Sequence, residues 1–521
     1  MSDPDRKSIA LVGFMGAGKS ASARALAEAL GEPAIDADAS IEDDAGSSVA
    51  ELFESEGEGG FRAREERIVL DLLDRGGIVA LGGGAVGSER VRAALRDHVT
   101  VWCDAELEVA WERASRNDKR PLARDRGEFE RRFGERRPLY ESVARAVLPS
   151  AAREAAPRAA PWLDALRRAP GVRLVWAISS SGEYPAAVGP GAAELLAIAA
   201  ESGADAGLPG RWFGVADAAV LTEHAGLLPA TEATVEVSGG ERSKSLAEAK
   251  RVLRELAAAG ANRDDGVAAL GGGVIGDLAG FVAATYQRGI AIAHLPTTLL
   301  AQVDSAYGGK TGVDLPEAKN YVGAYHQPVA VLADTRALRT LPGEEIAAGW
   351  AEVLKTALIA GGPLWERVRG LDELEGAELD EVIFACARTK LAVVAEDERD
   401  AGRRAVLNLG HTVGHAIEAA TGYSRYRHGE AVGLGLLAAL RLSGAGELRD
   451  EVAPLLARRG LPTSLAPDAD VERILAAVER DKKRTAVGIG FVLLERPGEP
   501  RVGQPVDPAS VRSAVEELRE R

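Results

Sequence analysis

The sequence predicts an α/β protein with two parallel-sheet regions followed by a mainly helical region. Short apolar runs alternate with amphipathic helical patterns from residue 7 to about 168 and again from 172 to about 334, which is typical of parallel sheets wrapped by helices. Beyond residue 334, apolar residues recur at spacings of three and four with few strand signals. The length of 521 residues exceeds what one hydrophobic core usually serves, so several domains are expected.

The alternation divides the chain into three predicted domains, residues 1–169, 170–334 and 335–521. An Ala-, Pro- and Arg-rich stretch at 150–171 is predicted to form the last helix of the first domain, ending at Pro170, and the junction after it. The second domain has the strand and helix order of a Rossmann-like fold, and the third is predicted to be mainly helical.

The amino-acid composition limits the kinds of binding partner that we expect for this protein. The net charge is -16, with 79 acidic and 63 basic side chains, which disfavours nucleic acid and anionic membranes. Only Cys103 and Cys386 are present, too far apart in sequence to indicate a disulfide framework, and the start of the chain lacks the pattern of a secretion signal. The longest apolar run, at 431–440, is well short of the roughly 20 residues that cross a bilayer. We therefore expect small-molecule substrates and a cytoplasmic location.

The first chemical motif, GFMGAGKS, stands where an apolar strand meets a helix. It satisfies the pattern GxxxxGK[ST], in which backbone N–H groups and a helix N-terminus surround phosphates. Lys19 would neutralise phosphate charge and Ser20 would bind Mg²⁺. The first domain is therefore predicted to be P-loop kinase-like. The residues expected around the nucleotide are Gly16, Ala17, Gly18, Lys19, Ser20 and Ala21.

Polar and glycine residues follow the next strands of the first domain, where parallel sheets place ligands. Asp36 and Asp38 close one strand, Arg62 lies in GGFRARE, and glycines 82–84 end another strand. An aspartate can orient or deprotonate a hydroxyl, an arginine can clamp a carboxylate, and glycines let a flat ring approach the backbone. Together these residues predict that the phosphoryl acceptor is a small hydroxylated carboxylic acid.

Residues 1–169 resemble the shikimate kinase family over nearly their whole length, in the segments GFMGAGKS, IDAD, GFRARE, LGGGA, KRPLA and ERRPLY. The resemblance implies phosphorylation of shikimate by ATP with Mg²⁺. It implies Lys19, Asp38 and Arg120 as catalytic residues, and Asp38, Arg62, Gly84 and Arg136 around shikimate. It also implies Asp36 with Ser20 at Mg²⁺, Arg120 on a mobile lid at the phosphates, and Arg113 and Arg153 beside adenine. The chain departs from the family at Ala21, where many members have Thr, and in the short lid segment LARDRGEF.

The second domain carries a glycine loop, GGGVIGD, between a predicted strand and a predicted helix. Gly271, Gly273 and Gly276 fit the dinucleotide pattern GxGxxG. The acidic residue expected about 20 positions later is absent, since that span reads AIAHLPTTLL. The loop therefore predicts a dinucleotide whose ribose is contacted differently from that of an ordinary Rossmann domain.

Three histidines, His411, His415 and His428, fall close together in the third domain. The first two are four apart on a predicted helix and so share a face. The intervening TVG lacks the Glu of HExxH, which excludes a zinc protease. Glu352, on another predicted helix, gives a Glu/His/His set with an open position for substrate oxygens. The cluster predicts a catalytic divalent metal.

Polar and basic groups are unusually frequent around these motifs for an acidic protein. Brought together, they would hold a substrate that carries both a carboxylate and a phosphate. The residues are Arg288, Asp304, Lys310, Asn320, Lys355, Lys390, Arg404, Asn408 and Lys482.

Residues 172–521 resemble the 3-dehydroquinate synthase family, in GGGVIGDLAGF, YQRG, LPTTLLAQVDSAYGGKTG, KNYVGAYHQP, AEVLK, NLGHTVGHAIE, HGEAVGLG and DKKR. The resemblance implies cyclisation of 3-deoxy-D-arabino-heptulosonate 7-phosphate to 3-dehydroquinate with loss of phosphate, using NAD⁺ and Zn²⁺ or Co²⁺. Glu352, His411 and His428 would bind the metal, and His415 would handle protons or lie just outside the ligands. NAD⁺ would contact Glu241, Lys244, Gly273, Val274, Ile275, Gly276, Asp277, Thr297, Thr298, Lys310 and Lys319.

The same resemblance implies substrate contacts from the polar and basic set, with Lys482 or Lys483 at the phosphate. The catalytic residues would be Lys310, Lys355, Arg404, Asn408 and His415. The resemblance also implies a homodimer formed through this half of the chain. Departures from the family pattern occur at Tyr307, Ser238 and Gly239.

The sequence therefore predicts a bifunctional enzyme of aromatic amino-acid biosynthesis, with the kinase first and the synthase second. Two alternatives remain open at this point. The C-terminal half could be a metal-dependent polyol dehydrogenase, which shares the glycine loop and the histidine cluster but releases NADH. The N-terminal half could be a module that senses ATP without transferring phosphate, although its predicted acid clamp argues against this.

We predict that Lys19→Met abolishes phosphoryl transfer and spares the synthase reaction, because it removes a charge partner of the phosphates at one site alone. His411→Ala has the opposite effect, because it removes a metal ligand of the other site. ADP and inorganic phosphate released by one preparation measure the two activities. Loss of both activities in folded protein carrying either change would contradict two separate sites.

Overall fold

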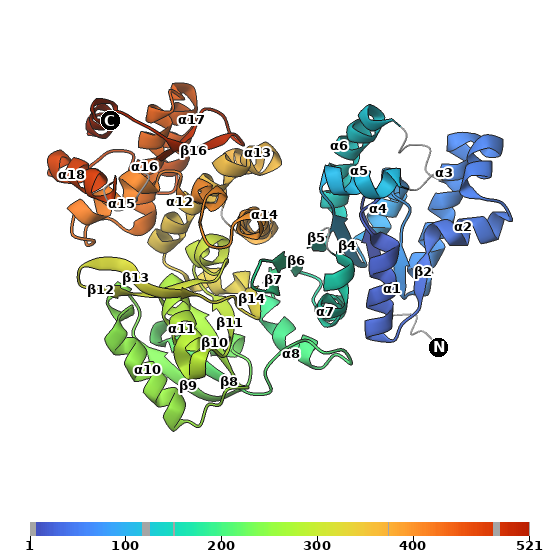
Figure 1. Cartoon of the computed structure of the whole chain (residues 1–521), viewed down its shortest axis with the longest axis horizontal. Helices are drawn as coiled ribbons and strands as arrows, with labels where there is room; N and C mark the ends of the chain where they lie inside the picture. The colour runs from blue at the N-terminus through green and yellow to red at the C-terminus, as the bar shows by residue number, and fades with distance from the viewer. Residues whose placement is uncertain (1–6, 117–124, 150–151, 374, 483–489, 520–521) are drawn as a thin grey trace. The chain divides into compact units, whose positions relative to one another are not determined.

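The computed structural model describes residues 7–116, 125–149, 152–373, 375–482 and 490–519 (Figure 1). The chain forms two compact units: unit 1 comprises Met1–Ala177 and Tyr184–Leu208, and unit 2 comprises Ile178–Glu183 and Pro209–Arg521. The predicted α/β fold is confirmed, with helices dominant after residue 342. The domain limits at residues 169 and 334 remain predictions. Among the described residues, we find no helix with the length and apolar content that a membrane span requires.

Unit 1 is built on a parallel sheet whose inner strands are buried on both faces, as strands between two layers of helices must be. In sheet order the strands are β2 (Ala34–Asp36), β3 (Ile78–Ala80), β1 (Ile9–Val12), β4 (Val99–Asp104), β5 (Ala146–Pro149), β6 (Arg173–Ile178) and β7 (Glu183–Val188). All pairs from β2 to β6 are parallel. The helices are α1 (Lys19–Leu30), α2 (Ala37–Ala45), α3 (Val49–Arg75), α4 (Glu89–Leu95), α5 (Leu107–Ser115), α6 (Arg126–Val143), α7 (Ala152–Ala165) and α8 (Leu195–Ala200).

Helix α7 ends five residues before the predicted limit at Pro170 and gives way to a 3₁₀ turn. The Arg145 guanidinium contacts this turn and donates hydrogen bonds to the carbonyl oxygens of Leu166 at 2.9 Å and Ala169 at 2.6 Å. Both carbonyls also accept backbone hydrogen bonds, Leu166 from the Ala169 amide and Ala169 from the Val172 amide, each at 3.1 Å. Arg145, a partly buried residue distant in sequence, therefore adds side-chain hydrogen bonds to the turn that follows the helix, which local sequence patterns do not predict.

Unit 2 contains a second parallel sheet and a layer of helices. In sheet order its strands are β14 (Ala330–Ala333), β11 (Ala291–Pro296), β10 (Gly266–Gly271), β8 (Trp212–Asp217) and β9 (Thr231–Val237). Two antiparallel hairpins are β12 (Lys310–Leu315) with β13 (Ala318–Tyr325), and β15 (Phe491–Leu494) with β16 (Pro500–Gln504). The helices are α9 (Ala218–His224), α10 (Leu246–Ala258), α11 (Gly273–Thr285), α12 (Gly343–Ala360), α13 (Gly362–Gly370), α14 (Gly376–Glu396), α15 (His411–Ala420), α16 (His428–Leu442), α17 (Gly446–Ala457), α18 (Val471–Lys482) and α19 (Pro508–Glu516).

Helix α16 is the central helix of the helical layer and explains the apolar run at 431–440, all of which is buried (Figure 1). Two glycines let it lie directly against its neighbours. A Cβ at Gly429 would stand 2.0 Å from the carbonyl oxygen of Ala348 on α12, and a Cβ at Gly435 would stand 2.0 Å from that of Gly410, at the start of α15. This backbone-to-backbone packing brings the first residue of α16 close to both neighbouring helices.

A buried ion pair ties the end of α7 to the end of α1 in unit 1. Arg167, with a side chain 6% exposed, binds both carboxylate oxygens of Glu32 at 2.7 and 2.9 Å and one oxygen of Asp164 at 2.6 Å. The neighbouring Arg168 pairs with Glu201 in solvent. The two adjacent arginines thus differ mainly in burial.

We predict that Arg167→Ala destabilises unit 1 by about 3 kcal/mol, because it leaves the Glu32 carboxylate buried without its partner. Arg168→Ala, the matched control, costs less than about 1 kcal/mol. Native-state hydrogen exchange of the β5 and α1 amides measures the opening free energy of this unit alone. Equal effects of the two substitutions would contradict the assignment.

Candidate active sites

The glycine loop of unit 1 joins β1 to α1 as the sequence predicts. Gly18 is the N-cap of α1 in a left-handed conformation, and no side chain caps the first turn. Gly16 has φ 85°, and a Cβ there would lie 2.2 Å from the carbonyl oxygen of Ala110, so only glycine fits. The Lys19 ammonium donates hydrogen bonds to the carbonyls of Gly13 and Phe14 at 2.9 and 3.1 Å. The open helix terminus and this lysine fit the phosphates of a nucleotide.

A second loop, residues 82–84 after β3, gathers the predicted acid-binding residues. A Cβ at Gly84 would fall 2.2 Å from Nη1 of Arg62, and a Cβ at Gly82 would fall 2.8 Å from a carboxylate oxygen of Asp38. Arg136 on α6 donates to the carbonyl oxygen of Gly83 at 3.3 Å. The structure thus brings Asp38, Arg62, Gly84 and Arg136 together.

Glu65 belongs to the same cluster and was not predicted from the sequence. It is 3% exposed, and its Oε2 lies 2.6 Å from Nη1 of Arg62. Burial raises the pKa of the Glu65 carboxyl, while the charge of Arg62 opposes that rise. Its position three residues after Arg62 on α3 places both side chains on one face of the helix, which is the signal that could have found it.

The other residues predicted to contact the nucleotide and its metal ion lie on several elements of unit 1. Asp36 caps α2, with Oδ1 accepting a hydrogen bond from the Asp38 amide at 3.1 Å. Ser20 lies in the first turn of α1, Arg113 is exposed near the end of α5, and Arg153 belongs to α7. Arg120 lies outside the described residues. The ligand roles of these residues remain predictions.

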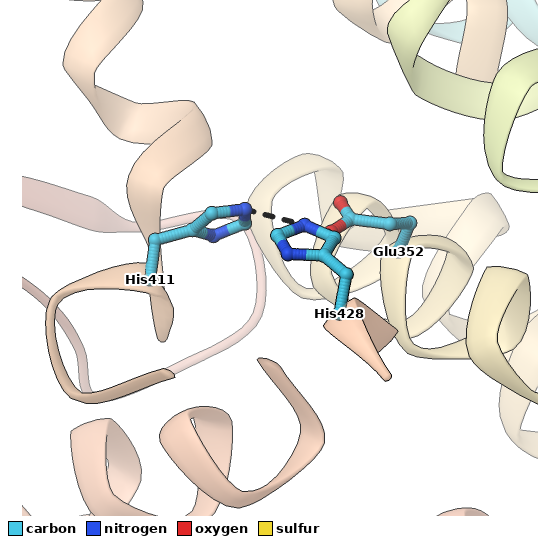
Figure 2. A group of neighbouring side chains, drawn as sticks. All are labelled: Glu352, His411 and His428. Carbon is cyan, nitrogen blue, oxygen red and sulfur yellow. Dashed lines mark ion pairs between the residues drawn. The ribbon is translucent and has the colours of Figure 1, made fainter. Parts of the chain in front are cut away.

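In unit 2, Glu352, His411 and His428 form one cluster, in which each offers a donor atom within 4.8 Å of the other two (Figure 2). Glu352 comes from α12, while His411 and His428 are the first residues of α15 and α16. Both imidazole Nε2 atoms approach the same oxygen, Oε1 of Glu352, at 3.5 and 3.4 Å. The close packing of α16 through its glycines produces this convergence.

The two histidines of the cluster have opposite electrostatic environments. Burial lowers the pKa of His411 to about 3, with the Lys355 charge acting in the same direction. Burial also opposes the proton on His428, but its contacts with Glu352 and Glu418 outweigh burial and raise the pKa to about 10. The surroundings therefore shift the pKa values of the two imidazoles in opposite directions.

The environment of the Glu352 carboxylate is suited to binding a divalent metal ion. The side chain is fully buried, and neither carboxylate oxygen has a hydrogen-bond partner among the described residues, although both take part in ion pairs. Burial alone would raise its pKa, but the charges of Lys355 and His411 hold that pKa well below the usual value. A buried, ionised carboxylate beside two imidazoles is the donor set expected for a catalytic zinc site with an open position.

Alternating charges extend from Glu352 towards the predicted substrate residues. Lys355 pairs with Glu352 and lies 3.9 Å from Oδ1 of Asp304. Lys390 pairs with the same oxygen of Asp304 at 2.7 Å. Three of the predicted substrate contacts therefore form one connected, mostly buried group.

A cavity of about 1220 Å³ opens between the glycine loop and the histidine cluster. Its walls include most of the residues predicted for NAD⁺, namely Glu241, Lys244, Gly273, Val274, Ile275, Asp277, Thr297, Thr298 and Lys319. Asp304, Asn320, His415 and His428 also line it. The hydroxyl oxygens of Thr297 and Ser305 are buried there without a hydrogen-bond partner among the described residues, which fits a polar ligand such as a dinucleotide.

Some predicted residues whose side chains the structure describes do not line this cavity, namely Arg288, Lys310, Lys355, Lys390, Arg404 and Asn408. Arg288 is exposed, and Lys310 pairs with Asp400 at 2.5 Å. Arg404 is buried and donates to the carbonyls of Gly308 and Glu398, while Asn408 is exposed. Lys482 ends α18 and Lys483 lies outside the described residues. Roles for these residues in catalysis or substrate binding remain predictions.

Family models match three parts of the chain: shikimate kinase at residues 15–167, 3-dehydroquinate synthase N-terminal at 234–348 and 3-dehydroquinate synthase C-terminal at 349–484. The 3-dehydroquinate synthase of Symbiobacterium thermophilum is 47% identical over 317 residues, which cover 59% of this chain and 87% of the relative. The chain belongs to the 3-dehydroquinate synthase family. With its shikimate kinase domain, it is a bifunctional enzyme of the shikimate pathway, having kinase and lyase activities. These family matches favour the predicted kinase and synthase over the alternatives of an ATP sensor and a polyol dehydrogenase.

Further relatives agree with this membership. The 3-dehydroquinate synthase of Nitrobacter winogradskyi is 41% identical over 352 residues, covering 64% of this chain and 89% of the relative. The structure of 2-deoxy-scyllo-inosose synthase with carbaglucose-6-phosphate, NAD⁺ and Co²⁺ is 26% identical with a TM-score of 0.57, covering 66% of this chain and 99% of that chain. A 2-epi-5-epi-valiolone synthase from Streptomyces hygroscopicus with NAD⁺ and Zn²⁺ is 25% identical with a TM-score of 0.58, covering the same shares.

We predict that Gly84→Ala raises the KM for shikimate roughly tenfold or more, because the new methyl group displaces the Arg62 guanidinium and weakens a charge-assisted contact. Stability changes little, since the displaced group is the end of a flexible side chain. Gly87→Ala is the control, because a Cβ at Gly87 meets nothing within 4 Å. An unchanged KM in the Gly84 variant would contradict the assignment of Arg62 to the acid pocket.

Proposed function

We propose that unit 1 transfers the γ-phosphoryl group of ATP to the 3-hydroxyl of shikimate. Asp38 accepts the hydroxyl proton at its carboxylate, and Arg62 and Arg136 hold the substrate carboxylate beside the 82–84 loop. When bound, ATP with Mg²⁺ supplies the phosphoryl group and neutralises its charge. The convergence of these three side chains on one glycine loop carries the proposal.

The glycine loop and Lys19 would hold the nucleotide in this reaction. The backbone N–H groups of residues 16–21 would surround the phosphates, and Ser20 with Asp36 would contribute to the Mg²⁺ site. Lys19 would exchange its present hydrogen bonds to the Gly13 and Phe14 carbonyls for contacts with the β- and γ-phosphates. Arg120 would close over the phosphates and Arg113 and Arg153 would flank adenine, as the family resemblance implies.

For unit 2 we propose the redox-neutral conversion of 3-deoxy-D-arabino-heptulosonate 7-phosphate to 3-dehydroquinate and inorganic phosphate. Glu352, His411 and His428 would hold Zn²⁺ or Co²⁺. When bound, NAD⁺ provides a reversible hydride acceptor and the divalent ion polarises a hydroxyl. The fully buried Glu352 carboxylate, with neither oxygen hydrogen-bonded among the described residues, is the observation that carries this proposal.

The protein side chains would orient the substrate and move its protons. Lys355 and Lys390, held by Asp304 of the cavity wall, would attract the anionic groups of the substrate. His415, exposed on the cavity wall, would accept and return protons at a ring nitrogen. Arg288, Lys310, Asn320, Arg404, Asn408 and Lys482 complete the proposed substrate contacts.

We also propose a homodimer formed through unit 2 and a cytoplasmic location. The dimer rests on the family resemblance alone. Both cysteines, Cys103 and Cys386, are free and buried, which agrees with a reducing compartment. The acidic net charge supports small-molecule substrates rather than nucleic acid or membrane partners.

The proposal is tested by removing metals from the full-length protein and restoring them one at a time. Mg²⁺ with ATP and shikimate is expected to restore ADP release. Zn²⁺ with NAD⁺ and the heptulosonate phosphate is expected to restore phosphate release, without NADH accumulating, because the hydride returns to the substrate. NADH formed in proportion to substrate consumed, or full phosphate release without Zn²⁺ or Co²⁺, would contradict the proposed chemistry.

A further inference from the structure

Glu418 is a buried acidic residue beside the proposed metal ligands that was not predicted from the sequence. It lies on α15, seven residues after His411 and three after His415, and so on the same face of that helix. The residue is 4% exposed, and its Oε2 accepts a hydrogen bond from Nδ1 of His428 on α16 at 3.3 Å. Glu418 therefore contacts a proposed metal ligand on the side away from Glu352.

The other oxygen of Glu418 is also engaged. Its Oε1 lies 3.6 Å from the Lys319 ammonium, which lies 3.3 Å from Oε1 of Glu241 and 4.5 Å from the centre of the Tyr423 ring. These contacts orient the carboxylate, because one oxygen faces the lysine while the other faces the imidazole.

The two imidazoles of the cluster are held in the same way. Nδ1 of His411 lies 3.3 Å from the carbonyl oxygen of Leu409, and Nδ1 of His428 lies 3.3 Å from Glu418. In both residues Nε2 is the atom that approaches Glu352. An acceptor at Nδ1 keeps the proton there and leaves the Nε2 lone pair available to a metal ion. A carboxylate does this more strongly than a carbonyl, because its negative charge also stabilises the positive charge that develops on the ring when Nε2 donates electrons to the metal.

We propose that Glu418 is a positioning residue that holds the Nδ1 proton and the ring orientation of His428, and thereby sets the affinity of unit 2 for its divalent metal. The inference rests on the proposed metal site. Glu418 lies on the wall of the cofactor cavity beside Lys319, so the proposal adds a second carboxylate to the residues that determine metal binding.

The test measures the Zn²⁺ dissociation constant of metal-free, full-length protein by competition with a chromophoric chelator. Glu418→Gln keeps the shape of the side chain and removes its charge. We expect it to weaken Zn²⁺ binding about 10- to 100-fold, the usual effect of losing such a partner. We expect Glu418→Ala to weaken binding at least as much. Glu447→Gln, a change of an exposed carboxylate on α17, is the matched control and leaves the affinity unchanged.

Two further measurements separate positioning from folding. The visible spectrum of the Co²⁺-loaded protein reports the geometry around the ion and is expected to change in Glu418→Gln. Kinase activity and thermal unfolding of the metal-free protein are expected to match those of the wild type, which shows that the variant is folded.

Each outcome decides a separate question. If wild-type protein fails to bind Zn²⁺, the proposed metal site is wrong. If the wild type binds one equivalent and Glu418→Gln binds it within twofold with an unchanged Co²⁺ spectrum, the positioning role is wrong. If the wild type binds a second equivalent that Glu418→Gln loses, Glu418 is itself a ligand together with His415 and His428, whose donor atoms also lie within 4.8 Å of one another, and the positioning role is again overturned.

Discussion

The charge of Glu352 is the constraint on which the synthase site depends. A carboxylate that is fully buried costs several kcal/mol unless opposite charges surround it. Here Lys355 compensates it from its own helix, and two imidazoles compensate it from the first turns of α15 and α16. These helices can approach so closely because glycines stand where their backbones meet. The packing of small residues in the core thus creates the geometry of the site.

The same alternation of charge continues on both sides of Glu352. On one side it runs through Lys355 and Asp304 to Lys390, where the substrate anions are proposed to bind. On the other side it runs through His428 to Glu418 and Lys319. In unit 1 the N-terminus of α1 and the side chains of Lys19, Arg62 and Arg136 supply the positive potential at the proposed anion sites, and the buried Glu65 pairs with Arg62 there.

The fold class and most of the site residues follow from sequence patterns that repeat locally. GFMGAGKS predicts its strand, loop and helix because phosphate binding requires that arrangement, and HTVGHAIE predicts a helix with two histidines on one face. Glu65 and Glu418 were not predicted, because a single acidic residue on a helix is usually solvated, and only tertiary packing buries it. The turn after α7 also includes a tertiary contact of this kind, since Arg145 reaches it from 21 residues away.

The position of the metal ion decides whether Glu352, His411 and His428 form the synthase metal site. The most direct measurement is an anomalous difference map, recorded at the zinc edge, from crystals of the full-length protein grown with Zn²⁺. A peak within about 2.0–2.2 Å of a Glu352 oxygen and of Nε2 of both His411 and His428 is the predicted result. A peak bound instead by His415 and Glu418, or no peak near Glu352, would contradict the central claim.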